Sequence, residues 1–350
     1  MMNSIGLYIH IPFCTRKCIY CDFYSLADTS LQEEYTAAVI RNIRHFGLSF
    51  DTVYFGGGTP SLMLPQNIAR ILDSADIEHG AEISMEANPD SVTPEKMAAY
   101  RSAGVNRVSL GIQSFDDREL SMLSRLHDSM GAKKALAAAL DTFSNVSADL
   151  MLGLPFQSMK TVTDNIDILA RFGVKHISAY MLKVEPGTEL SRRRDLLRGI
   201  DDDIQADIYE NAVGYLSDKG YGQYEISNFA VSGFECRHNF KYWHCEEYLG
   251  IGPAAHSFIG KRRFGVRGDI RSFMESPVME TFTTDDNAGG EVERMMLALR
   301  LNEGCDVPPD VAQRARRYID AGFMTLEGTR LRFTVKGMLV SNEILASLLM

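Results

Sequence analysis

Residues 6–21 read GLYIHIPFCTRKCIYC, in which a strand-like segment runs straight into three closely spaced cysteines. The alternation in Gly6–Ile11 predicts a β-strand. Cys14, Cys18 and Cys21 then follow with the spacing C-x3-C-x2-C, in what we expect to be the loop after that strand. Chance gives such a triplet in roughly one in several hundred chains of this length, so the three cysteines need a chemical explanation.

Three thiols in one loop suit an iron–sulfur cluster better than a zinc ion. Zinc usually takes four ligands, and a C-x2–4-C pair normally has a second pair downstream. Cys236 and Cys245 are the nearest candidates for such a pair, but they do not have this spacing. A cuboidal cluster held by three thiolates leaves one iron open to an external ligand. The sequence therefore predicts a 4Fe–4S cluster on Cys14, Cys18 and Cys21, with zinc as the alternative.

Outward from the cysteines, the first two thirds of the chain alternate β-rich runs with helix-like segments. Six βα repeats predict an α/β fold with a parallel sheet and outer helices, and their spacing favours a partial (β/α)6 barrel. The expected strands are Gly6–Ile11, Thr52–Phe55, Glu82–Glu86, Arg107–Gln113, Ala148–Leu152 and Lys175–Met181. The helix-like segments between them include Leu31–Phe46, Pro94–Ala103, Gly131–Thr142 and Thr161–Phe172.

Unusual residues stand where these strands end. GGGTP occupies residues 56–60, EANP residues 86–89, QSF residues 113–115 and GLP residues 153–155. In a parallel barrel the βα loops gather at the C-terminal ends of the strands. We therefore expect these segments to form one site together with the cysteine loop.

The pattern changes at about Asp201. A helix with early acidic residues begins there, and an aromatic-rich stretch that we expect to be irregular follows at residues 221–248. From about Gly289 we expect two helices, a hairpin over Phe323–Val335 and a last helix. This predicts three domains: a partial barrel at 1–200, an aromatic-rich extension at 201–285 and a small α+β winged-helix-like appendage at 286–350.

The composition limits the choice of partners. The chain has 350 residues, of which 45% are hydrophobic and 23% charged, as in ordinary globular proteins. Its net charge of −10 argues against nucleic acid as the main partner. No apolar run reaches the roughly 18 residues of a membrane span, and the N-terminus lacks a signal-peptide pattern. We therefore expect a cytoplasmic protein without a transmembrane segment.

The run from Tyr8 through Cys21 resembles the radical S-adenosylmethionine (SAM) superfamily, within its oxygen-independent coproporphyrinogen oxidase branch. The resemblance covers nearly the whole chain and implies that the amino and carboxylate groups of SAM chelate the open iron. The implied cofactor contacts are Tyr8, Tyr20, Gly57, Gly58, Thr59, Glu86, Gln113, Arg125 and Asp149. Taken singly, the glycines could form an ordinary turn, the tyrosines could be packing residues and the others barrel polar residues. Together they make chemical sense, because an arginine pairs with a carboxylate and carboxylates accept ribose hydroxyls.

Two features distinguish this chain from the oxidases of that branch. The oxidases have a further cysteine two positions after the third cluster ligand, where this chain has Phe23. They also have a longer N-terminal arm than the seven residues before Tyr8. The chain resembles instead the HemW-type heme chaperones, through an H-N-x-x-Y-W motif. The motif residues, and the implied heme contacts, are His238, Asn239, Tyr242 and Trp243.

An imidazole suits heme iron, and the tyrosine and tryptophan offer flat apolar faces. His238 could equally be a buried histidine that is hydrogen-bonded in an aromatic core. Zinc on Cys236, His238, His244 and Cys245 is a further alternative, although these residues stand close together for one tetrahedral ion. His256 is another candidate heme neighbour.

The resemblance thus predicts a chaperone that binds heme, a 4Fe–4S cluster and exchangeable SAM, and that transfers heme to an acceptor protein. Dimerisation on cluster loading is a further implication of the resemblance. Whether the chain is also an enzyme stays open. The alternative function is that of an oxygen-independent coproporphyrinogen III oxidase, which performs a radical SAM oxidative decarboxylation. A purely structural or metal-storage protein would not need the cofactor-type residues at the strand ends.

Overall fold

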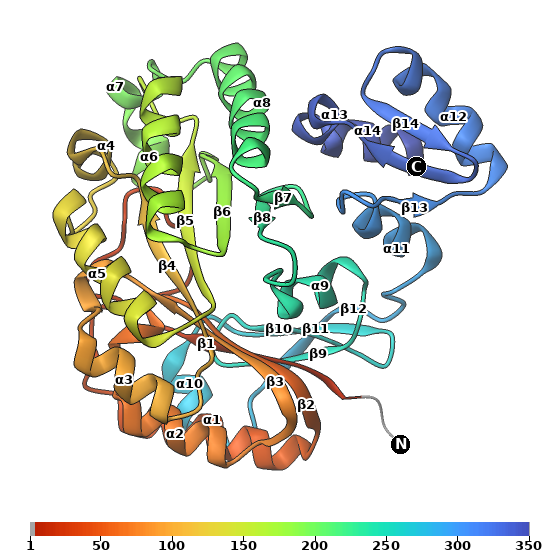
Figure 1. The fold of residues 1–350 in the computed structure, drawn as a ribbon. Helices are drawn as coiled ribbons and strands as arrows, with labels where there is room; N and C mark the ends of the chain where they lie inside the picture. Colours follow the sequence, from red (N-terminus) through yellow and green to blue (C-terminus); the bar gives the residue numbers. More distant parts are fainter. Residues whose placement is uncertain (1–3, 350) are drawn as a thin grey trace.

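The structure, a computed structural model, describes residues 4–349 and is built around one curved sheet (Figure 1). Its centre consists of six parallel strands that are neighbours in chain order, as predicted. They are β1 (Ile5–Ile11), β2 (Ser49–Gly57), β3 (Asp76–Ala87), β4 (Arg107–Gln113), β5 (Val146–Leu152) and β6 (His176–Met181).

Helices connect these strands and cover the outer face of the sheet (Figure 1). They are α1 (Gln32–Phe46), α2 (Pro65–Asp73), α3 (Pro94–Ser102), α4 (Asp117–Met122), α5 (Ser129–Thr142) and α6 (Met159–Phe172). Local chemistry sets several of their ends. The Thr93 hydroxyl caps α3 by accepting from the Lys96 amide, and Pro94 occupies its first turn. α1 and α6 end at Gly47 and Gly173, both in the left-handed conformation.

Short strands extend the sheet on both sides of this centre. On one side lie β9 (Tyr248–Ile251), β10 (His256–Ile259), β11 (Arg262–Val266) and β12 (Thr281–Asp285); on the other lie β7 (Gly222–Gln223) and β8 (Asn228–Ala230). The order is β12-β11-β10-β9-β1-β2-β3-β4-β5-β6-β8-β7, and within residues 4–349 β12 and β7 do not pair to close the barrel. The fold is thus the predicted partial barrel.

One expectation for this region was wrong. Residues 221–248 are not irregular, because they contain β7, β8 and the helix α9 (Arg237–Trp243), which holds the whole H-N-x-x-Y-W motif. The helix expected from Asp201 is present as α8 (Asp202–Asp218), and the Asp201 carboxylate caps it. The sheet continues across the expected boundary at residue 200, and the three-domain division stays a prediction.

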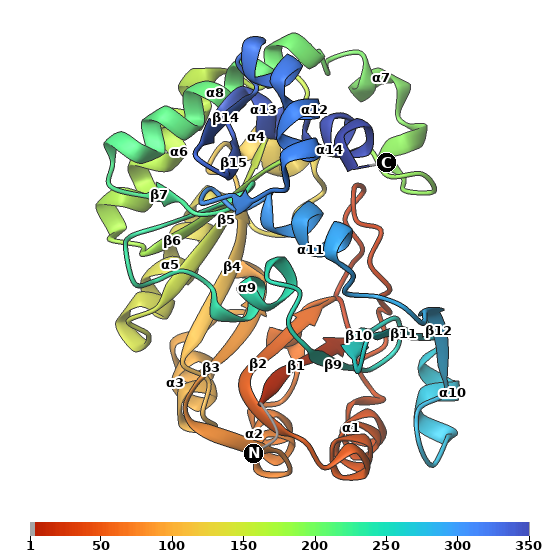
Figure 2. The same ribbon diagram turned by 90° about the vertical axis from the view of Figure 1, so that its right-hand side faces the viewer.

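The last part of the chain forms a small unit with its own three-stranded sheet. In chain order it contains α11 (Glu291–Ala298), β13 (Cys305–Asp306), α12 (Pro309–Asp320), β14 (Met324–Glu327), β15 (Arg330–Phe333), α13 (Val335–Leu339) and α14 (Ser341–Leu349). β14 and β15 are the predicted hairpin. Figure 2 shows this unit beyond α9, and its first helix, α11, is the part that contacts α9.

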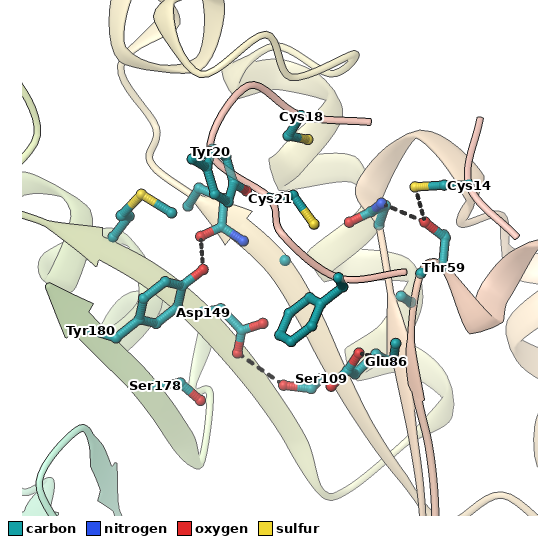
Figure 3. Close-up of a pocket in the computed structure, with 18 of the residues that line it drawn as sticks. Cys14, Cys18, Tyr20, Cys21, Thr59, Glu86, Ser109, Asp149, Ser178 and Tyr180 are labelled. Carbon is teal, nitrogen blue, oxygen red and sulfur yellow. Dashed lines mark hydrogen bonds between the residues drawn. The ribbon is translucent and has the colours of Figure 1, made fainter. Parts of the chain in front are cut away.

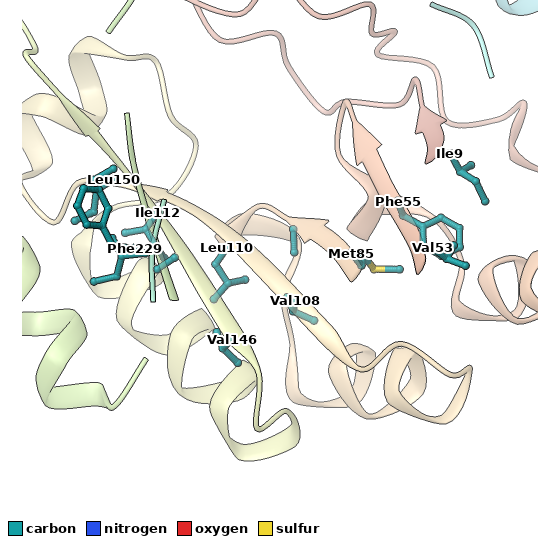
Figure 4. Packing of buried hydrophobic residues seen from close by; sticks show 14 of the residues in the cluster. Ile9, Val53, Phe55, Met85, Val108, Leu110, Ile112, Val146, Leu150 and Phe229 are labelled. Atoms are coloured by element: carbon teal, nitrogen blue, oxygen red, sulfur yellow. The ribbon is translucent and has the colours of Figure 1, made fainter. Parts of the chain in front are cut away.

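The alternation of side chains along the strands separates the core from the interior of the barrel. Val108, Leu110 and Ile112 of β4 are fully buried in the hydrophobic core (Figure 4). The alternate β4 positions, from Arg107 to Gln113, face the barrel interior and line a cavity there. The same period holds in β5, where Leu150 packs in the core while Asp149 faces the cavity.

No helix in the described part of the chain combines the length and apolar character needed to cross a membrane.

Candidate functional site

A cavity of about 430 Å³ lies inside the barrel (Figure 3). Its lining runs from the C-terminal strand ends to Arg107 and His176, the first residues of β4 and β6. Most of the residues predicted from the sequence line it. They are Cys14, Cys18, Tyr20, Cys21, Gly57, Gly58, Thr59, Glu86, Gln113, Arg125, Asp149 and Asn239. The cysteine loop and the polar strand ends therefore surround one space.

The cysteine loop is fixed by backbone hydrogen bonds at its two ends. The Cys14 amide donates to the Leu26 carbonyl at 2.9 Å, and the Leu26 amide donates to the Pro12 carbonyl at 2.6 Å. Two of the thiols also contact neighbouring loops. Cys14 Sγ lies 3.2 Å from Thr59 Oγ1, and Arg125 Nη1 donates to Cys18 Sγ at 3.5 Å.

The glycine-rich segment after β2 packs directly against the cysteine loop. The amides of Gly58 and Thr59 donate to the carbonyls of Ile11 and Phe13, each at 2.7 Å. A β-carbon at residue 58 would lie only 2.6 Å from the Phe13 carbonyl oxygen, so only glycine fits there. The observed partner of this segment is thus the backbone of Ile11 and Phe13, just before Cys14, and its expected contact with SAM stays a prediction.

The three thiols of the cysteine loop line the same cavity. Across residues 4–349, no three His, Cys, Asp or Glu side chains meet closely enough to hold one metal ion. A zinc site needs such a meeting point, whereas the thiolates of an iron–sulfur cluster each bond a different iron and therefore stand apart. The cluster on the three cavity-facing cysteines stays a prediction.

Two carboxyl groups face the inner part of the cavity. Glu86 accepts from the Tyr54 hydroxyl at 2.9 Å and from the Gly57 amide at 3.2 Å. Burial, with the nearby Asp149 carboxylate, raises the pKa of Glu86 to about 7. Burial also raises the pKa of Asp149, which accepts from Ser109 Oγ at 3.0 Å (Figure 3). Both groups can accept hydrogen bonds from sugar hydroxyls.

Arg125 is held in the cavity wall by its terminal nitrogens. Nη2 donates to Asn88 Oδ1 and to the Gly111 carbonyl, each at 2.7 Å, while Nη1 contacts Cys18. Its Nε is buried and has no partner among the described residues. Although burial lowers the pKa of Arg125, Tyr20 and Cys18 more than offset this and keep it above the ordinary value. The positive charge of Arg125 in the cavity wall favours an anionic group, such as a carboxylate, in the cavity.

Gln113 and Tyr8 have different positions relative to the cavity. Gln113 stands at the end of β4 with a φ of +68°, which is unusual for a residue other than glycine, and its Oε1 accepts from Tyr180 at 2.6 Å. Tyr8 does not line the cavity. It stacks on Tyr54, and its hydroxyl lies 3.1 Å from His10 Nδ1, as in a packing residue.

His238 of the aromatic motif is fully buried. Its Nδ1 lies 2.9 Å from Thr52 Oγ1, its Nε2 lies 2.8 Å from the Tyr242 hydroxyl, and its ring stacks on Tyr54 at 5.2 Å. Burial, together with the Lys241 charge, lowers the pKa of His238 to about 3. The imidazole is therefore neutral and uses both nitrogens, which is the geometry of a buried, hydrogen-bonded histidine.

The other residues of the H-N-x-x-Y-W motif have different surroundings. Asn239 lines the cavity, Tyr242 packs between His238 and Tyr248, and Trp243 faces the Arg300 guanidinium at 6.0 Å.

The cysteines of the alternative zinc tract are also apart. Cys236 Sγ contacts Glu82 Oε1 at 3.4 Å, whereas Cys245 packs against Phe258 beyond the other end of α9. His256 is exposed on β10.

Sequence reasoning missed Asn88, Tyr54, Ser109 and Tyr180 as site residues. The signal for Asn88 was its place in EANP, two residues after Glu86 and therefore on the same face of the chain. The others follow the same period along their strands, but a polar residue in a strand does not by itself indicate a cavity.

Comparison with known proteins adds to this picture. A family model described as the radical SAM superfamily matches residues 8–177. The heme chaperone HemW of Mycobacterium tuberculosis is 35% identical over 371 aligned positions, covering 99% of this chain and 95% of that protein. HemW of Escherichia coli is 34% identical, covering 91% of this chain and 84% of its own length. The structure of the E. coli coproporphyrinogen III oxidase HemN, a radical SAM enzyme, superposes with a TM-score of 0.80 at 19% identity, covering 99% of this chain and 90% of that one.

Proposed function

The chain belongs to the HemW family within the radical SAM superfamily, and from this we propose that it is a heme chaperone. In this proposal it binds heme, holds a 4Fe–4S cluster with exchangeable SAM, and transfers heme to an acceptor protein. The observation that carries the proposal is the likeness to HemW proteins over almost the full length of both chains. All six cysteines are free thiols, which suits the reducing cytoplasm where we place the protein.

The cavity supports the cluster and SAM part of the proposal. Cys14, Cys18 and Cys21 would hold the cluster, which when bound supplies one-electron reduction of SAM. The charged Arg125 guanidinium would attract the carboxylate of SAM, and the carboxyl groups of Glu86 and Asp149 would accept its ribose hydroxyls. Loss of iron and brown colour in a triple cysteine-to-alanine variant is the expected result; a variant that kept both would contradict this assignment.

Heme binding by the H-N-x-x-Y-W motif needs a local change at α9. His238 can reach heme iron only if its hydrogen bonds to Thr52 and Tyr242 break, because these bonds use both ring nitrogens. Trp243 is partly exposed and can contact a flat ligand without such a change. We therefore propose the motif as the heme site, with His238 as the residue that the first experiment tests.

The experiment is a heme titration of wild type, His238→Ala and His244→Ala. His244 lies directly after α9 and is a matched control, because it is partly exposed and outside the proposed heme contacts. We expect His238→Ala to weaken heme binding and His244→Ala to leave it unchanged. Equal binding by wild type and His238→Ala would remove His238 from the site. A wild type that bound no heme would contradict the chaperone function itself.

The second candidate function is oxygen-independent coproporphyrinogen III oxidase. The observation that favours it is that all predicted cluster and SAM residues except Tyr8 line the cavity, where a chaperone need not use them for chemistry. The observation against it is Phe23, which lines the cavity and is 60% exposed at the position where the oxidases have a cysteine.

A further inference from the structure

A chain of hydrogen-bond contacts links two of the three cavity thiols. Cys14 Sγ lies 3.2 Å from Thr59 Oγ1, and Thr59 Oγ1 accepts from Asn88 Nδ2 at 2.9 Å. Asn88 Oδ1 in turn accepts from Arg125 Nη2 at 2.7 Å, and Arg125 Nη1 donates to Cys18 Sγ at 3.5 Å. Figure 3 shows the Cys14–Thr59 end of this chain. We call these contacts the thiol relay.

Asn88 is the centre of the thiol relay and is itself held rigidly. Its backbone amide donates to Ser61 Oγ at 3.3 Å, and its backbone carbonyl accepts from the Ser91 hydroxyl at 2.7 Å. The two serine hydroxyls lie 2.5 Å from each other. The Asn88 side chain must donate on one side and accept on the other, which an amide does and a carboxylate or an apolar group cannot.

We propose that Asn88 is a positioning residue that orients Cys14 and Cys18 together, through Thr59 and Arg125. The inference deepens the proposed cluster site and rests on it. Groups that hydrogen-bond to metal ligands orient those ligands and tune the metal. Hydrogen bonds to the sulfurs are also one determinant of the reduction potential of an iron–sulfur cluster. Asn88 thereby governs both cluster retention and cluster potential, although it is not one of the proposed cluster ligands.

Three variants separate this role from a general structural one. Asn88→Leu keeps the approximate size and removes both hydrogen bonds. Asn88→Asp keeps the acceptor for Arg125 but cannot donate to Thr59. Asn67→Leu is the matched control, since Asn67 is also buried and hydrogen-bonded to an arginine, but lies in α2 away from the cavity.

The first measurement uses the reconstituted protein and records iron loss to a chelator and the reduction potential of the cluster. We expect Asn88→Leu to lose iron about 10–100-fold faster than wild type. Its potential should become more negative, because the Arg125 charge that favours the reduced cluster is then held beside Cys18 only by the bond to the Gly111 carbonyl. Asn88→Asp should lose iron faster but keep a potential closer to wild type, and Asn67→Leu should match wild type. Asn88→Leu with wild-type iron loss and potential would overturn the proposal.

The second measurement needs no cluster. In the apoprotein, Asn88→Leu, Cys18→Ala and the double variant are compared by their urea midpoints. The thiol relay predicts that the two shifts are not additive, because either change breaks the same chain of contacts. Additive shifts would overturn the relay even if wild type bound its cluster. A wild type that took up no iron would contradict the proposed function, while this cycle would still decide the role of Asn88.

Discussion

At the scale of single residues, the cavity changes the chemistry of its own side chains. Glu86 and Asp149 face the same cavity, and burial raises the pKa of both. The pKa of Glu86 is raised further by the nearby Asp149 carboxylate, because two like charges repel. A group whose pKa is close to neutrality responds to small changes in pH. Glu86 is therefore a residue at which the pH dependence of this protein can be tested.

Replacing Glu86 by glutamine should remove a pH-dependent part of the free energy of unfolding. The pKa of Glu86 is about 7 in the folded chain and 4.5 when unperturbed, so the folded state holds the extra proton between these values. The stabilisation by protonated Glu86 is present in full below pH 4.5 and is lost as the pH rises through 7. Wild type should thus lose on the order of 2 kcal/mol relative to Glu86→Gln between pH 5 and 8.

Urea unfolding of both proteins at several pH values measures this difference. Glutamine keeps the size of Glu86 and one acceptor oxygen for the Tyr54 hydroxyl or the Gly57 amide, so the two proteins can be compared. A difference in unfolding free energy that stayed constant over this range would show that Glu86 is ionised throughout.

At the scale of elements, α9 depends on a residue far away in the sequence. The helix has seven residues and no side-chain cap from its own N-cap residue, Cys236. Instead Glu82 of β3 accepts from the amides of Arg237 and His238, at 3.0 and 3.2 Å. A carboxylate at this end satisfies free amides and complements the helix dipole. Glu82 also helps to keep the pKa of the buried Arg107 raised, against the opposing effect of burial.

Glu82→Ala should therefore destabilise the protein by about 3 kcal/mol, since it leaves helix amides without an acceptor and Arg107 without its compensating charge. Glu82→Gln, which keeps an acceptor, should cost less. Hydrogen exchange would locate the effect: amides of α9 should exchange faster in Glu82→Ala, whereas those of α5 should not change. Equal exchange at both helices would contradict this role for Glu82.

This dependence explains why the sequence did not reveal α9. The six central strands follow from local periodicity, and β1 was predicted within one residue of its observed start. The N-terminal cap of α9 lies 155 residues before Arg237, and β9 pairs with the distant β1, so neither follows from a local pattern. The same holds for Asn88, whose partners Thr59 and Arg125 come from other loops, whereas the cysteine spacing could be recognised locally.

At the scale of the whole molecule, the barrel and the C-terminal unit share one hydrophobic core. Buried residues of the unit, such as Leu299 and Leu345, belong to the same cluster as Leu110 and Phe229 of the barrel. The boundary predicted at residue 286 is thus crossed by packing as well as by the chain. An unfolding experiment can measure whether the predicted domains unfold independently.

The shared core predicts that the apoprotein unfolds in one cooperative transition. Circular dichroism, which follows all helices, and the fluorescence of Trp243, the only tryptophan, should give the same urea midpoint. Trp243 lies beside Arg300, close to the junction with the unit. Separate midpoints for the two signals, or early hydrogen exchange confined to residues 286–349, would show that the C-terminal unit unfolds independently.

The measurement that tests the central claim most directly is an oxidase assay of the reconstituted protein. The cluster is rebuilt without oxygen, SAM, a reductant and coproporphyrinogen III are added, and the decarboxylated product is sought by chromatography. A coproporphyrinogen III oxidase in a parallel reaction shows that the conditions work. A heme chaperone with Phe23 beside its cavity should give no product while the oxidase does. Product formed at a rate comparable to that of the oxidase would contradict the chaperone function and identify the protein as the enzyme.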